Sequence, residues 1–384
     1  MKILLVVSSL GGGGTERAAA DLSTFLAGRH QVAVFPFHDR ASYRYGGRLL
    51  PAPMTYKPPS GLLSRIARLV KKYRALKEAV ELERPDVMMS LGDGANLVAL
   101  LCKFTGAASV PVVVNAQVAP LRNYRGIERL LYLGLMKVLY PRADAIVAIS
   151  SGIGSELSER FRVPAGRVRV IANPIDLDEI VRKSHETADL ESRGSPMVLT
   201  VGRLASQKNH ELLLRAFREV RRDLGANLVI LGEGPLRPRL EELARRLEVD
   251  DSVSLLGWRD NPFSFMRSAE VMVLPSEYEG FGNVLVEAMA CGCPVVATDC
   301  PYGPSEILDG GRYGVLVERG NERAIALAIR SLLTDRERAA ALRRAGIERA
   351  RDFALETIGA RYESLLEACV ANRGGLPARA VAKA

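Results

Sequence analysis

Short runs of apolar residues alternate along the chain with longer segments in which apolar residues recur every three or four positions. Runs that polar residues do not interrupt are typical of strands that are buried on both faces of a parallel sheet. Six such runs in the first half predict strands at 2–7, 31–37, 86–90, 112–115, 145–149 and 168–172. Six more in the second half predict strands at 197–202, 227–231, 252–256, 271–274, 294–298 and 314–317.

The segments between these runs have helical periodicity, which favours parallel sheets with helical crossover connections. The strands form two such sets, so the pattern predicts an α/β protein with two doubly wound, Rossmann-like domains. We place the first domain at residues 1–172 and the second at 196–352. The polar segment 173–195, with Pro174 and the "RGSP" sequence, is the expected linker. A helix is expected at 353–370, and a disordered tail at 371–384.

Length and composition agree with this division, because 384 residues are too many for one ordinary domain. The chain is 48% hydrophobic and 25% charged, as is usual for globular proteins. The longest apolar run, 130–136, is too short to span a bilayer. The N-terminal "MKILLVV" leads into a glycine-rich turn and no cleavage site, so we interpret it as a first strand and not as a signal peptide.

The net charge of +9 suggests contact with nucleic acid, an anionic membrane or a phosphorylated substrate. Nucleic acid is the least favoured, because aromatic residues are only 6% of the chain and no base-stacking motif is present. The five cysteines are an odd number, which predicts no disulfide framework and fits a reducing cytoplasm. Cys291 and Cys293 form C-x-C, for which small buried residues are a better interpretation than zinc ligands.

The most informative turn of the second half is "VGRLASQKN", where Arg203 leaves a strand and Lys208 precedes a helix with Asn209 as its N-cap. Two cations beside a helix N-terminus make an anion site that suits a diphosphate. Two solvated surface charges are the alternative. The next strand ends in "GEG", whose Gly232 and Gly234 permit close approach of a ligand or simply a tight connection.

The stretch "SEYEGFGNVLVEAMACG" places Glu279 in a turn after a strand and Glu287 inside the following helix. Ligands of open α/β sheets bind at such strand ends. Two carboxylates there can accept hydrogen bonds from sugar and ribose hydroxyls, with phosphates near Arg203 and Lys208 between them. Taken singly, Glu279 could be a capping residue and Glu287 a member of a helical ion pair.

The first half offers a glycine-rich loop and a basic helix. "SSLGGGGTER" follows the first strand and suits close approach to phosphate, although its glycine spacing departs from the dinucleotide fingerprint. Apolar residues at positions 62, 66, 69, 70, 73 and 76 have helical spacing. The remaining positions carry Arg65, Arg68, Lys71, Lys72, Arg74 and Lys77. Such a helix can lie on an anionic membrane surface, or pack on the core with a solvated basic face. The segment 128–140 could add a second apolar contact, although we expect a buried core helix there.

Together the motifs resemble the family-4 retaining glycosyltransferases of the GT-B fold, in which two Rossmann-like domains face each other across a cleft. The resemblance rests on "GGTER", "RVRVIANPID", "VGRLASQKN", "LGEGPLRPRLEEL", "LLGWRDN", the E-x7-E element and "GPSEIL". They occur in the family's order over nearly the whole chain. The resemblance implies a first domain that binds the acceptor, a second domain that binds the nucleotide-sugar donor, and a C-terminal helix that returns to the first domain.

The resemblance also implies roles for individual residues. Arg203 and Lys208 would bind the donor diphosphate and act in catalysis with Glu279. Glu279 and the backbone of Phe281 and Gly282 would contact the donor sugar, and Glu287 would hold the ribose. Remaining donor contacts would come from Gly13 and Gly14 at the phosphates and from Gly257 and Trp258 beside the base.

The mechanism implied by the family is transfer with retention, by front-face attack of the acceptor hydroxyl, and the leaving diphosphate accepts the proton. No metal and no cofactor is expected, and "DLD" at 176–178 lies in the linker and is discounted. Many relatives carry a histidine after the strand at 112–115, where this chain has "NAQ". Asn115 and Gln117 are therefore only candidate acceptor contacts, and His210 is interpreted as structural.

"GGTER" and "GPSEIL" resemble most the family members that extend polyprenyl-diphosphate-linked or other envelope glycans. With the basic helix, this predicts a lipid-linked glycan acceptor, a UDP-hexose or UDP-N-acetylhexosamine donor, and a location at the cytoplasmic face of the membrane. Two alternatives stay open. One is an NAD-dependent oxidoreductase that uses the glycine-rich loop and His38–Asp39, and the other is a GT-B binding module without transferase activity.

Overall fold

The computed structural model describes residues 1–55, 61–123, 126–187 and 194–372. The chain divides into two compact units. The N-terminal unit comprises Met1–Pro174 and the C-terminal segment that begins at Leu355, and the C-terminal unit comprises Ile175–Ala354. Each unit is described by itself. The expected disordered tail at 371–384 lies outside the described residues beyond 372.

The N-terminal unit contains a seven-stranded sheet in the order β3-β2-β1-β4-β5-β6-β7. Every neighbouring pair is parallel, as the first pair shows with Leu4 opposite Ala33. The strands are β1 (Lys2–Val7), β2 (Gln31–Pro36), β3 (Arg48–Leu49), β4 (Val87–Leu91), β5 (Val112–Ala116), β6 (Ala145–Ala148) and β7 (Val168–Val170).

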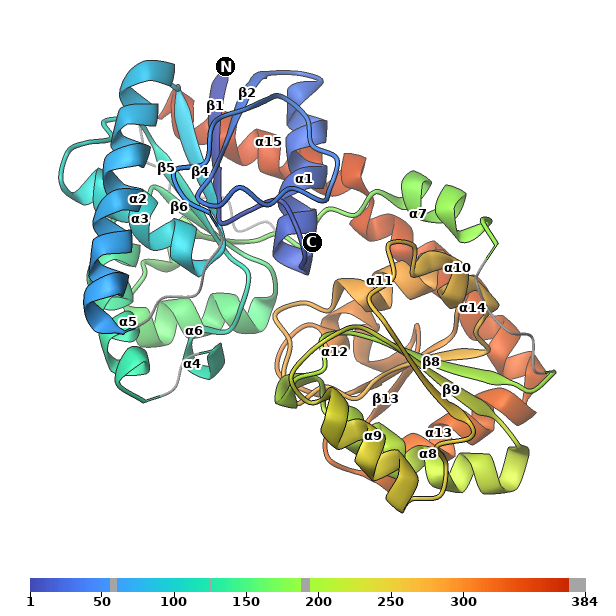
Figure 1. Cartoon of the computed structure of the whole chain (residues 1–384). Coiled ribbons are helices and arrows are strands. Elements are labelled where there is room, and N and C mark those ends of the chain that lie inside the picture. Colours follow the sequence, from blue (N-terminus) through green and yellow to red (C-terminus); the bar gives the residue numbers. More distant parts are fainter. Residues whose placement is uncertain (56–60, 124–125, 188–193, 373–384) are drawn as a thin grey trace. The chain divides into compact units, whose positions relative to one another are not determined.

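Helices cover both faces of this sheet. They are α1 (Gly14–Ala27), α2 (Leu62–Glu83), α3 (Asp93–Phe104), α4 (Pro120–Asn123), α5 (Gly126–Leu139), α6 (Ser151–Phe161) and α15 (Leu355–Ala371). α2 packs on α3 and α3 on α5, whereas α1 packs on α15. Figure 1 shows α2 and α3 on one side of the strands and α1 and α15 on the other. The odd-numbered positions Ile3, Leu5 and Val7 join the core formed with α1 and α15, and Leu4 and Val6 are fully buried on the opposite face.

The C-terminal unit contains a six-stranded sheet in the order β10-β9-β8-β11-β12-β13, also entirely parallel. Its strands are β8 (Met197–Val201), β9 (Asn227–Leu231), β10 (Val253–Gly257), β11 (Val271–Leu274), β12 (Val295–Thr298) and β13 (Val315–Val317). Its helices are α7 (Leu177–Ser184), α8 (His210–Leu224), α9 (Arg237–Arg246), α10 (Phe263–Ser268), α11 (Asn283–Ala290), α12 (Pro304–Ile307), α13 (Glu322–Thr334) and α14 (Arg336–Ala350). α8 lies between α9 and α13, and α11 packs on α14 (Figure 1).

The two parallel sheets confirm the expected fold class, and all twelve predicted strands are present. β3 was not predicted, because its two residues Arg48 and Leu49 are both exposed and form no apolar run. The segment expected to be a linker contains α7, which belongs to the C-terminal unit. Single-turn 3₁₀ helices occur at Tyr140–Arg142, Ala165–Arg167, Ser206–Lys208, Asp309–Gly311 and Arg351–Phe353.

Candidate active site

The order of strands in the C-terminal unit brings two distant loops together. From β8 the chain moves outward through β9 and β10, and then returns to β11 on the other side of β8. The loops that leave β8 and β11 at their carboxyl ends therefore begin side by side at the point where the direction of winding changes. Open α/β sheets bind their ligands at such a point. Arg203 and Lys208 lie in the first of these loops and Glu279 lies in the second.

Hydrogen bonds join the two loops directly. The backbone N–H of Glu277 donates to the carbonyl of Gln207 at 2.8 Å, and the Gln207 side chain donates to the carbonyl of Tyr278 at 2.9 Å. Asn209 occupies the N-cap position of α8, but its side chain makes no capping bond. Its amide donates instead to the Glu277 carboxylate at 2.6 Å. The expected cap is therefore replaced by a contact that fixes one loop on the other.

Lys208 and Glu279 form an ion pair. Lys208 Nζ lies 2.6 Å from Glu279 Oε1, and the hydroxyl of Ser276 donates to the same oxygen at 2.6 Å. Glu279 is buried, with 5% of its surface exposed. Burial and the Glu279 charge raise the pKa of the neighbouring Cys300 thiol to about 12. The sequence analysis predicted that Lys208 contacts the diphosphate and Glu279 the sugar. It did not predict the ion pair between the two side chains.

Arg203 differs from Lys208 in its surroundings. It directly follows Gly202 after β8 and is exposed. Within the described part of the chain its guanidinium has no hydrogen-bonding or ionic partner. A planar guanidinium that is free to reorient can bind two oxygens of a phosphate at once. The loop thus contains Lys208, which is held in an ion pair, and Arg203, which is available to bind a phosphate.

The turn that carries Glu279 is fixed from its other side by the segment after β12. Glu279 N–H donates to the carbonyl of Pro301 at 2.8 Å, and Tyr302 N–H donates back to the Glu279 carbonyl at 3.2 Å. Gly303 approaches so closely that a Cβ there would lie 2.0 Å from the Phe281 carbonyl oxygen. The Phe281 ring is buried against Phe353 with ring centroids 5.4 Å apart. The "GPSEIL" motif therefore acts as a support for the acidic turn.

Gly282 ends this turn with a φ of 107°, a conformation that other residues rarely adopt. α11 begins at the next residue, Asn283. Glu287 lies in the second turn of α11 and is half-buried. The structure thus places Glu287 in the helix that follows the Glu279 turn, and its contact with a ribose stays a prediction.

The glycines after β9 and β10 allow the backbone of neighbouring loops to pack together. A Cβ at Gly232 would lie 2.1 Å from the carbonyl oxygen of Gly202, and one at Gly234 would lie 2.4 Å from that of Leu204. Gly232 N–H in turn donates to the carbonyl of Gly257 at 2.8 Å. These glycines hold the Arg203 loop close to its neighbours. Trp258, directly after Gly257, is 52% exposed, which leaves its ring accessible to a ligand.

His210, the first residue of α8, is buried. Burial and then the nearby Lys208 charge lower its pKa to about 4, so the ring is neutral near pH 7. This agrees with its interpretation as a structural residue. The five cysteines are all buried and unpaired, and burial raises the pKa of Cys291 to about 12, which fits their expected structural role.

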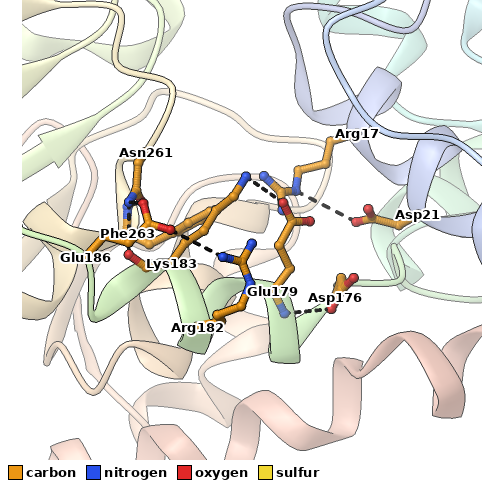
Figure 2. A network of polar contacts seen from close by, with 9 residues as sticks. All are labelled: Arg17, Asp21, Asp176, Glu179, Arg182, Lys183, Glu186, Asn261 and Phe263. Atoms are coloured by element: carbon orange, nitrogen blue, oxygen red, sulfur yellow. Dashed lines mark hydrogen bonds and ion pairs between the residues drawn. The ribbon is translucent and has the colours of Figure 1, made fainter.

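The N-terminal unit has its own point of reversal between β1 and β4. Gly13 is the N-cap of α1 and Gly14 is its first residue, so this loop leaves the carboxyl end of β1. A Cβ at Gly13 would lie 2.6 Å from Glu16 Oε2. Burial raises the pKa of Glu16. One turn further along α1, Arg17 Nε lies 3.8 Å from Asp21 Oδ2 (Figure 2).

Asp93 is a candidate that sequence reasoning missed. It is the first residue of α3, after the carboxyl end of β4, and it is 7% exposed. The preceding Gly92 has a φ of 88°, and a Cβ there would lie 3.3 Å from the Thr15 side chain in α1. The loops after β1 and β4 are therefore neighbours, and a buried carboxylate lies beside the glycine-rich turn. The sequence "LGDGAN" after a buried strand was the available signal.

Asn115 and Gln117 lie at the end of β5, and both are buried. Asn115 Nδ2 donates to the Tyr362 hydroxyl at 2.7 Å. Gln117 Nε2 donates to Asn115 Oδ1 at 3.0 Å and to Asn173 Oδ1 at 2.7 Å. Asn173 Nδ2 donates back to Gln117 Oε1 at 3.0 Å. Because these amides already bond to protein groups and tie β5 to α15, we do not include them in the proposed acceptor site.

The basic helix expected near residue 70 is α2. Arg65, Lys71, Arg74 and Lys77 are exposed on it, and Lys77 Nζ lies 3.7 Å from Glu81 Oε1. Arg68 is half-buried. Lys72 departs from the expectation of a surface charge, because it is also half-buried and its ammonium lies 5.0 Å from the centre of the Phe37 ring. Burial lowers the pKa of Lys72.

The apolar stripe of α2 is mostly uncovered in its first half. Ile66, Leu69 and Val70 are exposed, and the helix is buried only from Leu76 onward. The side chain of Leu62 lies outside the described set. The expectation that 128–140 forms a buried core helix is wrong for most of its apolar residues. In α5, Leu130, Leu131, Leu135 and Val138 are exposed, whereas Met136 and Leu139 are buried.

The "DLD" sequence lies at the start of α7, where its first residue has a structural role. Asp176 caps the helix by accepting from the Glu179 N–H at 2.9 Å. Lys183 pairs with Glu179 one turn later, and Asn261 Nδ2 donates to the Lys183 carbonyl at 2.9 Å (Figure 2). Asn261 also reaches Glu186 at 2.8 Å. The "GWRDN" motif thus contributes a contact that fixes the end of α7.

In the described part of the chain, one group of residues of the types that bind metals lies close together. It consists of His30, Glu363 and Glu367. His30 Nε2 lies 2.7 Å from Glu363 Oε1, so a hydrogen bond accounts for the proximity of these two residues. It lies at the amino end of β2, at the opposite edge of its sheet from the glycine-rich loop. None of the described helices is long and apolar enough to cross a membrane.

Comparison with known proteins identifies the family of the chain. The family described as "Glycosyl transferases group 1" matches residues 182–349, and "Glycosyltransferase Family 4" matches residues 12–179. A relative from Campylobacter jejuni is 32% identical over 339 residues, which cover 87% of this chain and 90% of the relative. It is named N-acetylgalactosamine-N,N'-diacetylbacillosaminyl-diphospho-undecaprenol 4-alpha-N-acetylgalactosaminyltransferase.

Solved structures show the same fold. Sucrose-phosphate synthase from Thermosynechococcus elongatus superposes with a TM-score of 0.81 at 23% identity, over 97% of this chain and 100% of that protein. Anabaena HepE in complex with UDP and glucose superposes with a TM-score of 0.76 at 21% identity, over 96% and 99%. With two parallel Rossmann-like sheets, both family matches and a relative that is similar along nearly its whole length, the chain belongs to the group 1, family 4 glycosyltransferases of the GT-B fold.

Proposed function

We propose that this glycosyltransferase moves a hexose or N-acetylhexosamine from a UDP-sugar to a polyprenyl-diphosphate-linked glycan, with retention of the anomeric configuration. The observation that carries the proposal is the arrangement after β8 and β11. There the exposed Arg203 lies in the same loop as a lysine that is held 2.6 Å from a buried glutamate. The similar enzyme of Campylobacter jejuni is named as a transferase that acts on a diphospho-undecaprenol glycan, and HepE was solved with UDP and glucose.

In this proposal Arg203 and Lys208 bind the donor diphosphate. Negative charge grows on the diphosphate as the bond to the sugar breaks, so cations fixed beside it stabilise the transition state more than the ground state. Glu279 holds the Lys208 ammonium in place through Oε1. No hydrogen bond from the described residues reaches Glu279 Oε2. That oxygen can therefore accept from a hydroxyl of the donor sugar.

The remaining donor contacts from the C-terminal unit follow the same end of its sheet. The backbone at Phe281 and Gly282 would contact the sugar, Glu287 the ribose, and the exposed Trp258 with Gly257 the base. The Gly13–Gly14 loop would contribute N–H groups to the phosphates. Proton transfer requires no metal in this scheme, because the acceptor hydroxyl attacks on the face that the diphosphate leaves and gives its proton to a diphosphate oxygen.

The membrane side of the proposal rests on α2. A polyprenyl-linked acceptor stays in the bilayer, so the enzyme has to work at the membrane surface. The first half of α2 presents Arg65 and Lys71 together with the exposed apolar residues Ile66, Leu69 and Val70. This combination is typical of helices that lie in the interface of anionic membranes. We place the protein at the cytoplasmic face, where UDP-sugars are made.

A screen of nucleotide sugars tests the donor. UDP-, GDP- and ADP-sugars are compared by thermal shift, since a ligand that binds only the folded state raises the melting temperature by mass action. We expect a UDP-sugar to give the largest shift and Arg203→Ala to abolish it. Mass spectrometry of the same mixtures then tests for slow donor hydrolysis and for transfer to a diphospho-polyprenol glycan. Binding without hydrolysis or transfer would support the alternative of a binding module, and no shift with any UDP-sugar would contradict the proposal.

A further inference from the structure

The surface of the N-terminal unit has an uneven distribution of exposed apolar side chains. Sixteen large hydrophobic residues are exposed in the described chain, and nine of these lie on α2, α3 and α5. These helices make up 48 of the 384 residues (22 in α2, 12 in α3 and 14 in α5). Because α3 packs between α2 and α5, the nine side chains belong to one layer of helices. Apolar surface that gathers on one side of a protein marks a site of interaction.

Beside this layer, α5 and α6 enclose a groove of about 360 Å³. The groove is lined by Leu121, Gly126, Arg129, Leu130, Leu133, Gly134, Lys137, Arg160 and Phe161. Its volume is in the range of sites that hold small ligands, about 300–1,000 Å³. It belongs to the N-terminal unit alone and contains none of the residues that we assign to the donor.

The charged side chains that the structure describes along the groove have a single sign. Arg129, Lys137 and Arg160 line it and are exposed, and no acidic residue is among the described lining residues. These three cations form no ion pair with a carboxylate of another described residue. Elsewhere the chain pairs many of its exposed cations, as at Arg239 with Glu211 and Arg330 with Asp223. A cluster of cations without carboxylates favours an anionic ligand.

The walls of the groove are apolar. Leu130 and Leu133 come from α5, and the buried Phe161 ends α6. Leu130 is 76% exposed, although it could have packed inward. A second stripe, Leu131, Leu135 and Val138, follows at helical spacing on the same helix and is also exposed. The groove therefore joins an anion-binding rim to apolar surface, and the ligand that satisfies both is an anionic amphiphile.

We propose that the groove between α5 and α6 binds an acidic phospholipid of the membrane, with the headgroup phosphate at Arg129, Lys137 and Arg160 and the first part of the acyl chains against Leu130, Leu133 and Phe161. The exposed stripe of α5 then enters the bilayer interface alongside α2. This inference rests on the proposed location of the enzyme at the membrane and is independent of the identity of the donor sugar.

Gly134 provides a test that leaves every charge in place. It lines the groove in the middle of α5, is exposed, and a Cβ there would meet no atom within 4 Å. Gly134→Gln places a polar side chain at the groove without adding apolar surface. Glutamine also has a higher helix propensity than glycine, so the fold should be maintained or strengthened.

Flotation with vesicles of phosphatidylcholine, with or without phosphatidylglycerol, compares four proteins. These are the wild type, Gly134→Gln, the groove triple variant Arg129→Gln/Lys137→Gln/Arg160→Gln, and a control with the same loss of charge, Arg323→Gln/Arg336→Gln/Arg344→Gln. The control residues are exposed and lie in the C-terminal unit. We expect both groove variants to lose at least about tenfold in affinity for phosphatidylglycerol vesicles, and the control to bind as the wild type does. Equal binding by Gly134→Gln and the wild type would overturn the proposal.

A second measurement separates the lipid from a free anion. Dihexanoyl-phosphatidylglycerol, used as a soluble monomer, should raise the melting temperature of the wild type and leave that of Gly134→Gln unchanged. Protection by inorganic phosphate as strong as that by the lipid would overturn the lipid assignment and leave a simple anion site. Transfer to a water-soluble acceptor analogue should be the same in both proteins. If the wild type does not transfer sugar to this analogue, the result counts against the proposed function and not against lipid binding in the groove.

Discussion

Lys208 and Glu279 are 71 positions apart in the chain, and their side chains meet at 2.6 Å. The pair is largely buried, with 19% of the lysine and 7% of the glutamate side chain exposed. Removing one partner of such a pair leaves the other charge in a poorly solvated position, which costs about 3–5 kcal/mol when the pair is fully buried. We expect Lys208→Met to lower the melting temperature more than the double variant Lys208→Met/Glu279→Gln does.

The control for this comparison is the pair of Arg239 and Glu211, in which 66% of the arginine side chain is exposed. Arg239→Met should change stability by less than about 1 kcal/mol. Circular dichroism melts of the wild type and the three variants measure the effect. A double variant that is less stable than Lys208→Met would contradict the idea that the two charges stabilise each other.

Arg203→Ala should lower kcat/KM for sugar transfer by about 100- to 1,000-fold, which is the usual effect of removing one preorganised group that stabilises transition-state charge. Its melting temperature should stay unchanged, because the guanidinium is exposed and has no ionic partner in the described structure. Arg218→Ala, an exposed arginine on α8, is the matched control and should retain full activity. Equal activity of the two variants would exclude Arg203 from the donor site.

The glycines after β9 should matter through the position of the Arg203 loop. Gly234→Ala puts a methyl group 2.4 Å from the Leu204 carbonyl oxygen, so this loop has to move. We expect a rise in KM for the donor of at least about tenfold with a folded protein, since a displacement near 1 Å is enough for such losses. Steady-state kinetics measure it. Gly166→Ala provides the comparison, because its Cβ would meet no atom within 4 Å and its φ lies outside the left-handed region.

His210 should make stability depend on pH. Its pKa is lowered to about 4 in the folded state by burial and by Lys208, against 6.5 for the free side chain. As the pH falls from 6.5 toward 4, only the unfolded chain gains a proton at this histidine. The free energy of unfolding therefore falls by about 3 kcal/mol over that range, and His210 lowers it no further below pH 4. His210→Gln should flatten this part of the profile, measured as melting temperature against pH. His185→Gln, at an exposed site, should leave the slope unchanged.

The buried amides of the N-terminal unit should affect stability and not chemistry. Asn115→Ala removes one hydrogen-bond partner from the Tyr362 hydroxyl and one from the Gln117 amide, which costs about 1–3 kcal/mol. Denaturant unfolding gives this value. The folded fraction should keep its KM for the acceptor. A large rise in that KM with unchanged stability would return Asn115 to the acceptor site.

The sequence was sufficient to predict every strand except β3, because each of the others is a run of mainly apolar residues. It was also sufficient to place Arg203, Lys208 and Glu279 after strands, and therefore to predict a ligand site at the carboxyl ends of the strands. It could not show that Lys208 binds Glu279, because this contact depends on β8 and β11 being neighbours, and strand order leaves no mark in local periodicity. The oxidoreductase alternative was excluded by the family comparison and not by any feature of the glycine-rich loop.

Exposure was the other quantity that the sequence could not give. The leucines of α5 have the spacing of a core helix, yet four of its apolar side chains are exposed. Periodicity shows which residues share a face, but not whether anything covers that face. The same limit applies to Asn115 and Gln117, whose polarity suggested a ligand although their partners are other buried amides and a tyrosine.

The return of α15 to the N-terminal unit has a consequence for biosynthesis. Ile358, Tyr362, Leu365 and Leu366 complete the core around β1 and α1, yet they leave the ribosome after the entire C-terminal unit. The unit that is translated first can therefore finish folding only after the unit that is translated last has emerged. Until then the part of the sheet face that α15 covers stays exposed beside α1.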